Sequence, residues 1–241
     1  MSAETSGELS VVVETGVVYR NPDAHITSRH AYFPSAIPLG DGEVLVSFNV
    51  GEAFEAENLR VELSRSQDGG RSWSSEGRLG VSEAAAGVSE SIKAVRVGDG
   101  TIVGLLQRHD RRELPGEGLT CGDTLGFVPT RFETTESADG GRTWSEPKRV
   151  EPPIEGPEWE LCAPITELSD GRWLLITSTW PDWHGHLPNG HRMCAFVSQD
   201  RGASWPECLT VMSEPESEAV IFWESKIVEF SDGRLLAVAW C

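Results

Sequence analysis

The stretch Ser66-Gln67-Asp68-Gly69-Gly70-Arg71-Ser72-Trp73 occurs in three versions along the chain. The other two are Ser137-Ala138-Asp139-Gly140-Gly141-Arg142-Thr143-Trp144 and Ser198-Gln199-Asp200-Arg201-Gly202-Ala203-Ser204-Trp205. In this pattern, S-x-D-x-G-x-[ST]-W, the Asp carboxylate accepts hydrogen bonds from the backbone N–H groups that follow it, which closes a turn. The Trp then returns a large apolar surface to the neighbouring sheet. Recurrence at intervals of 71 and 61 residues predicts a repeat architecture.

A second motif, Asp-Gly between two apolar runs, alternates with the first. Its copies are Asp41-Gly42, Asp99-Gly100, Asp170-Gly171 and Asp232-Gly233. Asp-Gly in this setting is a strong signal of a β-hairpin. Each unit therefore reads as four antiparallel strands: strand, Asp-Gly turn, strand, variable loop, strand, eight-residue turn, strand. Such a unit is the blade of a β-propeller.

The sequence thus predicts an all-β propeller in a single domain, residues 1–241. Four-stranded antiparallel blades are expected at about 32–79, 91–150 and 161–212, and a fourth begins at 225–241. Residues 9–19 read as a further strand. Because propellers hide their strand edges by closing into a ring, we expect these three and a half blades to be a C-terminally incomplete part of a longer ring.

Composition narrows the class of partner. The formal net charge of −18 argues against nucleic acid, whose phosphates require clustered Lys and Arg. No apolar run approaches the roughly 18 residues of a membrane span. The N-terminus shows no basic and apolar leader, and the five cysteines lack regular spacing. We therefore expect a cytoplasmic protein without a membrane partner or cofactor. The sequence carries no signal of oligomeric state.

The order of strands predicts which end of each blade carries function. Both kinds of short turn fall at one end, and the variable loops fall at the other, where binding residues are usually placed. The innermost strands should bring to that end Arg29, Tyr32, Glu90, Glu160 and Glu224. The variable loops should bring Glu57, Arg108, Asp110, Trp183, His184 and His186. Paired carboxylates, arginines and Trp rings suit carbohydrate chemistry. The alternative is that these are solvated loop side chains.

The loop with His184 and His186 is also compatible with a site for a divalent metal ion, because His191 and Asp182 are near in sequence. A loop that contacts sugar, or an ordinary exposed loop, is the favoured interpretation. We therefore predict no metal site.

The repeated turns and hairpins resemble the Asp-box (BNR-repeat) propellers of the sialidase superfamily, over residues 30–241. The resemblance implies a six-bladed ring, a Tyr nucleophile assisted by a Glu, an Asp acid/base and three arginines that grip the sialate carboxylate. The run Glu224-Ser225-Lys226-Ile227-Val228-Glu229-Phe230-Ser231-Asp232-Gly233 resembles the family's E-x-x-V-V-E-L-x-D-G. It implies that Glu224 activates a Tyr, which would lie beyond Cys241.

The chain departs from the family pattern at three places. Tyr32-Phe33-Pro34 stands where the family has R-I-P, Trp240 stands where an Arg is usual, and the first variable loop offers glutamates instead of Asp. Arg29, Arg108 and Glu57 are the candidates to fill these roles. Asp-boxes also occur in propellers that are not sialidases, so the resemblance is more specific for fold than for activity.

We therefore predict a sialidase-like glycoside hydrolase of the exo-α-sialidase type that removes a terminal, acidic sugar. The predicted catalytic residues are Glu224, Glu57, Arg29 and Arg108. The predicted substrate-binding residues are Tyr32, Glu90, Asp110, Glu160, Trp183, His184 and His186. The alternative is a non-catalytic propeller that binds a glycan or a protein on the same face.

Overall fold

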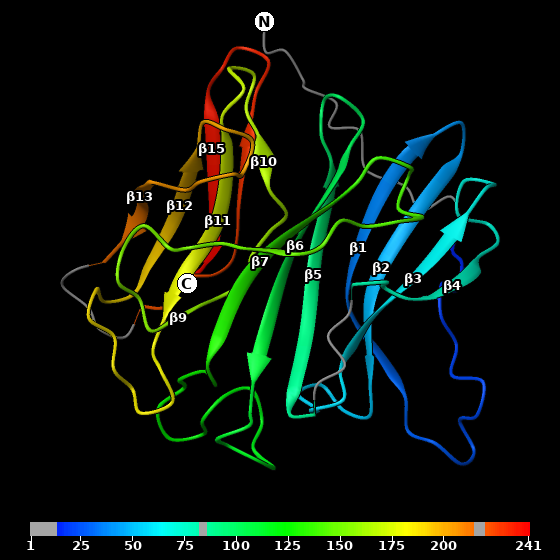
Figure 1. Ribbon diagram of the computed structural model, residues 1–241, viewed down its shortest axis with the longest axis horizontal. Helices are drawn as coiled ribbons and strands as arrows, with labels where there is room; N and C mark the ends of the chain where they lie inside the picture. The colour runs from blue at the N-terminus through cyan, green and yellow to red at the C-terminus, as the bar shows by residue number, and fades with distance from the viewer. Residues whose placement is uncertain (1–13, 82–85, 215–219) are drawn as a thin grey trace, which may run out of the picture.

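The computed structural model describes residues 14–81, 86–214 and 220–241. All regular structure in these ranges is β-strand, arranged in antiparallel sheets that stand side by side, as the sequence predicts (Figure 1). No helix in the described ranges is long and apolar enough to cross a membrane. Part of the strand expected at 9–19 lies outside the described residues, and 14–19 form no strand.

The first two sheets are four-stranded meanders, which we call blades 1 and 2. Blade 1 joins β1 (His30–Gly40), β2 (Glu43–Gly51), β3 (Arg60–Ser66) and β4 (Ser74–Arg78) in chain order. Blade 2 joins β5 (Val88–Arg96), β6 (Ile102–Asp110), β7 (Thr130–Ser137) and β8 (Lys148–Arg149) in the same order. The Asp-Gly hairpin joins the first two strands of each blade, because this dipeptide accepts the left-handed backbone of a tight turn.

Blade 3 has an interrupted first strand. Both β9 (Glu158–Trp159) and β10 (Thr166–Glu167) pair with β11 (Trp173–Trp180), which is followed by β12 (Arg192–Ser198) and β13 (Glu207–Ser213). Pro164 lies in the interruption and has no N–H to donate to a ladder. Blade 4 is the hairpin of β14 (Trp223–Glu229) and β15 (Leu235–Trp240).

The three Asp-box turns share the hydrogen bonds from the Ser hydroxyl and from the fourth N–H after the Asp to the carboxylate; in the third turn the Ala203 N–H donates to the Asp200 carbonyl instead of the carboxylate. Asp139 accepts the Ser137 hydroxyl at 2.8 Å, the Arg142 N–H at 3.0 Å and the Thr143 N–H at 2.9 Å. Asp68 and Asp200 repeat the serine contact at the same 2.8 Å. These bonds favour the ionised carboxylate and hold the pKa of all three aspartates below the usual range.

Asp-box turns and Asp-Gly hairpins lie at the same end of the blades, which we call the turn end. The Gly69 N–H donates to the Gly42 carbonyl at 2.8 Å, so the two turns of blade 1 touch. Contacts also link neighbouring blades: Arg65 of blade 1 donates to the Gly140 carbonyl of blade 2 at 2.8 Å. The long loops lie at the opposite end, the loop end, which is the lower edge in Figure 1.

The apolar core is divided into layers between successive blades. Leu45, Leu63 and Ile92 belong to the layer between blades 1 and 2. Phe132, Trp173 and Phe196 belong to the layer between blades 2 and 3, and Ile176 and Ile227 to the layer between blades 3 and 4. The sheets therefore pack face to face, as propeller blades do.

The Asp-box tryptophans seal one edge of these layers. Trp144 packs against the layer between blades 1 and 2, Trp205 belongs to the next layer, and Trp73 covers the outer face of blade 1 with Val18 and Tyr19. They occupy corresponding positions in the three blades, so the blades are structural repeats, although only Trp73 and Trp144 donate their indole N–H to a glycine carbonyl, at 2.9 and 3.1 Å. This rigid array fixes where the first strands of each blade begin at the loop end.

Candidate functional site

A cavity of about 200 Å³ opens at the loop end, where the first strands of the blades converge. We call it the funnel cavity. Blade 1 contributes to its wall from β1 and from the loop after β2, and blade 2 from β5, β6 and the loop after β6. Blade 3 contributes from the interruption of its first strand, and blade 4 from β14. The lining residues are Phe33, Phe54, Glu55, Ser91, Lys93, Gln107, His109, Leu119, Thr120, Phe127, Glu160, Leu161, Trp223 and Glu224.

Two residues that line the funnel cavity have a strained backbone. Phe33 and Glu224 both have a positive φ, 52° and 47°, which L-residues other than Gly, Asn and Asp rarely adopt. Each lies at a β-bulge, since the register shifts between Tyr32 and Ser35 in β1 and between Trp223 and Lys226 in β14. A bulge re-aims a side chain. Strain of this kind is concentrated at functional sites, and both of these residues line the funnel cavity.

Glu160 is held beside Glu224 in this cavity. Its Oε1 accepts the Glu224 backbone N–H at 3.3 Å, and its Oε2 accepts the Cys162 thiol at 3.2 Å. Burial raises the pKa of the Glu160 carboxyl to about 7, because desolvation disfavours the charged form more than the hydrogen bonds favour it. Near neutral pH this carboxyl can therefore give or take a proton.

Aromatic rings form two walls of the cavity. Phe33 and Phe54 of blade 1 lie with ring centroids 5.2 Å apart, and Tyr32 meets Phe54 edge-on behind them. On the other side, Trp180 stacks on Phe127 at 4.7 Å and meets Trp223 edge-on at 5.2 Å. Flat apolar faces of this kind, with a few polar groups between them, are typical of small-ligand sites.

The polar groups between the walls come from β5 and β6. Ser91 and Lys93 of β5 line the cavity with Gln107 and His109 of β6. Burial, with the charge of Arg111, lowers the pKa of His109 to about 3, so its imidazole is neutral at physiological pH. The carboxylate of Glu55 is held by the backbone of Leu119 at 2.9 Å and the hydroxyl of Thr120 at 2.9 Å.

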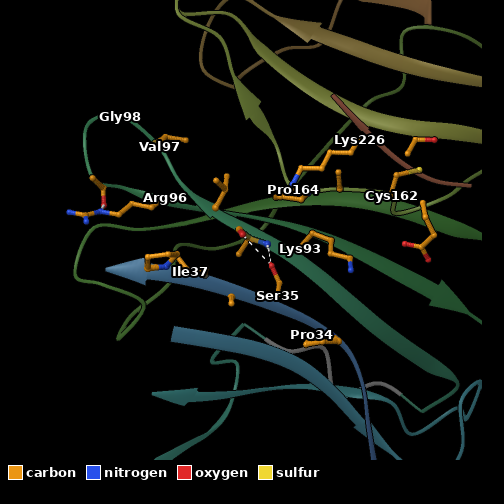
Figure 2. A pocket seen from close by; sticks show the side chains of 18 of the residues that line it. Pro34, Ser35, Ile37, Lys93, Arg96, Val97, Gly98, Cys162, Pro164 and Lys226 are labelled. Atoms are coloured by element: carbon orange, nitrogen blue, oxygen red, sulfur yellow. Dashed lines mark hydrogen bonds between the residues drawn. The ribbon is translucent and has the colours of Figure 1, made fainter. Parts of the chain in front are cut away.

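A wider channel continues from this cavity along the inner strands toward the turn end. Its volume is about 1010 Å³, and Lys93 and Glu224 line both spaces. Figure 2 shows this channel from close by, with Ser35 of β1, Lys93 of β5 and Lys226 of β14 around it. The first strands of the blades therefore surround a common space, as the strand order predicts.

Glu90 and Arg108, both expected at this face, are buried between blades 1 and 2, where Glu90 Oε1 accepts the Val61 N–H of blade 1 at 3.3 Å. Glu90 is 1% exposed and Arg108 is 2% exposed, and the two form an ion pair between β5 and β6. The reason is strand parity. Glu90 precedes Asp99 by nine residues, whereas Glu160 and Glu224 precede Asp170 and Asp232 by ten and eight. Side chains alternate between faces of a strand, so the odd offset turns Glu90 away from the channel and Ser91 toward it.

Four further predicted residues lie near the loop end but do not line the funnel cavity. Tyr32 stands behind Phe33 and Phe54. Glu57 accepts the Gly116 N–H at 2.9 Å and so supports the loop after β6. Asp110 pairs with the exposed Arg112. Arg29 lines a separate surface hollow formed by residues 21–30.

The loop after β11 holds the other three predicted residues. His184 and His186 are exposed, and their backbone N–H groups both donate to the Asp182 carboxylate at 2.9 Å. The Trp183 carbonyl accepts the Thr124 hydroxyl at 2.9 Å. Across residues 14–81, 86–214 and 220–241, no three His, Cys, Asp or Glu side chains are grouped so that they could hold a metal ion.

Of the predicted residues, the structure therefore brings Glu160 and Glu224 together at the funnel cavity. Sequence reasoning missed Phe33, Phe54, Lys93, Gln107, Phe127 and Trp223 as lining residues. Lys93 could have been found from its position in the strand. It lies six residues before Asp99, and an even offset from the Asp-Gly turn places a side chain on the channel face, as for Glu160 and Glu224. Phe127 had no comparable signal, since it lies in a long loop whose path is set by tertiary contacts.

The sequence matches no protein-family model and no curated protein. Among solved structures, a protein of unknown function from Dyadobacter fermentans superposes with a TM-score of 0.68 at 22% identity. The alignment covers 92% of this chain and 64% of that one. The intramolecular trans-sialidase of Ruminococcus gnavus, in complex with oseltamivir carboxylate, gives 0.64 at 12% identity and covers 92% and 68%.

A third similar structure is the leech intramolecular trans-sialidase complexed with 2,7-anhydro-Neu5Ac. It gives a TM-score of 0.65 at 12% identity, with coverage of 95% of this chain and 50% of that one. At these identities the likeness shows the fold. The chain has the all-β, sialidase-like propeller fold, and it spans about half to two thirds of the length of these proteins.

Proposed function

We propose that this protein is a sialidase-like glycoside hydrolase that removes a terminal sugar bound in the funnel cavity. The observation that carries the proposal is the meeting of Glu160 and Glu224 on one small cavity with aromatic walls. A cavity of about 200 Å³ is smaller than the roughly 300–1,000 Å³ of drug-sized ligand sites. The aromatic rings on its two walls suit the apolar faces of one terminal sugar ring.

The two carboxyl groups differ in environment, which separates their roles. Glu160 is desolvated and its pKa of about 7 keeps much of it protonated near neutrality, as a general acid requires. In the proposed reaction the Glu160 proton goes to the glycosidic oxygen as the bond from that oxygen to the anomeric carbon breaks. Water adds to the anomeric carbon and gives a proton to Glu224, and proton exchange with solvent then restores the starting forms of both carboxyl groups.

The strain at Glu224 supports this assignment. A positive φ at a Glu costs free energy in the folded state, and a structural position would be filled more favourably by Gly. The bulge that creates the strain places Glu224 beside Glu160 and the edge of Trp223. Neither Glu160 nor Glu224 forms an ion pair like the buried one between Glu90 and Arg108.

The test is a screen of 4-methylumbelliferyl glycosides with the full chain and its variants. We expect Glu160→Gln and Glu224→Gln each to lower kcat/KM at least about 100-fold on the substrate that is turned over, the range typical of general acid–base groups. Glu151→Gln, at an exposed site outside the cavity, is the matched control and should leave kcat/KM unchanged. Unchanged turnover in both cavity variants would remove this site from the reaction. Binding of glycosides without turnover would instead favour a glycan-binding propeller.

A further inference from the structure

The carboxyl group of Glu160 is fixed by groups from three elements. Its Oε2 accepts the Cys162 thiol at 3.2 Å, and its Oε1 accepts the Glu224 N–H of β14 at 3.3 Å. From β11, the Ser178 carbonyl accepts the Glu160 N–H at 3.0 Å, and the Thr177 hydroxyl donates to the Glu160 carbonyl at 2.8 Å. Of these contacts, the bond from Cys162 is the one that a side chain makes to the carboxyl, so a substitution can remove it.

Cys162 is itself held between blades 3 and 4. It is 7% exposed and packs in the layer that contains Phe222 and Ile227. Its sulfur lies 3.8 Å from the hydroxyl oxygen of Ser178, which in turn lies 3.2 Å from that of Ser225 in β14. Cys162 also lines the wider channel (Figure 2). The packing of two blades therefore determines where the thiol stands.

The thiol of Cys162 acts as a hydrogen-bond donor to this carboxyl. Burial, followed by the charge of Glu160, raises the pKa of the Cys162 thiol, so it keeps its proton at neutral pH. A donor to a carboxyl favours the ionised form of that carboxyl. A thiol is a weak donor, however, whereas a hydroxyl at the same place would be a stronger one. The contact can therefore orient Glu160 and still leave desolvation as the larger influence on its proton.

We propose that Cys162 is a positioning residue for the general acid: its thiol holds Oε2 of Glu160 in place and, as a weak donor, lets the carboxyl keep the proton that it delivers. This inference rests on the proposed function for the role of Glu160. As that proton leaves for the glycosidic oxygen, the carboxyl becomes an ionised acceptor and the bond from the thiol strengthens. The contact thus stabilises the transition state of proton transfer more than the starting state. The thiol keeps its own proton throughout.

Further titratable groups surround this pair from other elements. They are Glu55 from the loop after β2, Lys93 from β5, His109 from β6, and Glu224 and Lys226 from β14. All of them stay unchanged when Cys162 is substituted, so a change in the titration of Glu160 in such a variant reports on the contact between the thiol and the carboxyl.

The experiment reads the Glu160 carboxyl directly. The full chain is labelled with 13C at the side-chain carboxyl of glutamate and titrated by NMR between pH 4.5 and 9, and the Glu160 signal is assigned by its loss in Glu160→Gln. Cys162→Ala should move the midpoint to higher pH by roughly 0.5–1 pH unit, because a donor to the ionised form is lost. Cys162→Ser should move it to lower pH, because a hydroxyl is the stronger donor. Cys241→Ala, at an exposed cysteine, is the matched control and should leave it in place.

Shifts in opposite directions distinguish this role from lost packing, which would act in the same direction in both variants. A midpoint that fails to rise in Cys162→Ala, or fails to fall in Cys162→Ser, would overturn the inference whether or not any glycoside is turned over. If Cys162→Ala does not fold, the direction of the shift in Cys162→Ser decides alone.

Activity gives the second readout. On a substrate found in the glycoside screen, the falling limb of kcat/KM should follow the NMR midpoint in each variant, to higher pH in Cys162→Ala and to lower pH in Cys162→Ser. A limb that ignores the midpoint would overturn the positioning role. Opposite shifts of the midpoint in a protein that turns over no glycoside would uphold the action of Cys162 on Glu160 and refute the hydrolase function.

Discussion

At the scale of single residues, the buried position of Glu160 determines the pKa of its carboxyl group. It lies in the interruption between β9 and β10, where its backbone N–H donates to Ser178 and its carboxyl is turned into the funnel cavity. Desolvation is the largest cause of its raised pKa, and the attraction of Lys93 is the smallest. The group can therefore hold a proton at a pH at which an exposed Glu has lost it.

This protonation predicts the pH dependence of activity. If Glu160 is the acid, kcat/KM should fall as the pH rises through about 7, because the protonated fraction is lost there. The measurement is kcat/KM between pH 4.5 and 9 on a substrate found in the screen. Lys93→Met should move this limb to higher pH, since it removes an attraction that favours the ionised form. A falling limb near pH 7 that persists in Glu160→Gln would contradict the assignment to Glu160.

Backbone strain at Glu224 predicts a trade between stability and activity. Glu224→Gly should stabilise the fold by about 0.5–1 kcal/mol, because Gly accepts a φ of 47° without the steric cost that Glu bears. The same change should abolish turnover. Chemical denaturation measures the free energy of unfolding. Lys226→Gly, at an exposed position two residues along β14, is the control and should destabilise by a similar amount. A destabilised Glu224→Gly variant would show that the residue is not strained.

At the scale of elements, blade 2 is crossed by a buried chain of charges. Arg108 of β6 stands opposite Glu90 of β5 and is paired with Glu133 of β7, which also accepts Arg131 at 2.8 Å. The guanidinium donates in addition to the Val81 carbonyl at 3.1 Å. The side chain therefore links three strands and the segment that leads into blade 2.

Substitution of Arg108 should lower the free energy of unfolding without changing the funnel cavity. Arg108→Met removes the guanidinium that pairs with the buried Glu90 carboxylate, which is expected to cost about 3–5 kcal/mol of unfolding free energy. Arg112→Met removes an exposed pair with Asp110 and should cost about 1 kcal/mol or less. Thermal unfolding measures both, and kcat per folded molecule should be unchanged in Arg108→Met. A stable variant that had lost substrate binding would restore the predicted contact of Arg108 with substrate.

The same elements show what a sequence can and cannot reveal. Hairpins, Asp-box turns and strand order are local, because each is set by a few adjacent residues such as Asp139 and its neighbours. The orientation of Glu90 depends on a single residue of register, and the bulges at Phe33 and Glu224 alter register locally. Offsets from each Asp-Gly turn would have separated Glu90 from Glu160. The enclosure of Arg111 by Glu55 and Ser89 joins segments distant in the chain and has no local signature.

At the scale of the whole molecule, the fold places its repeated turns at one end and the funnel cavity at the other. The turn end contains the repeated hydrogen bonds of the Asp-boxes, and the loop end contains the funnel cavity. The repeat in the sequence predicted this division. The sequence repeat could not predict the dimensions of the cavity. These depend on the conformations of the loops after β2 and β6, which contribute lining residues.

The links between blades at the turn end have a consequence for how such a protein can diverge. Arg65 ties blade 1 to Gly140 of blade 2, and Arg201 of blade 3 pairs with Asp99 of blade 2 at 2.6 Å. These bonds link neighbouring blades at the end remote from the funnel cavity. Insertions and deletions in the opposite loops can therefore accumulate without changing the spacing of the blades, so the loop end can diverge while the same frame is inherited intact.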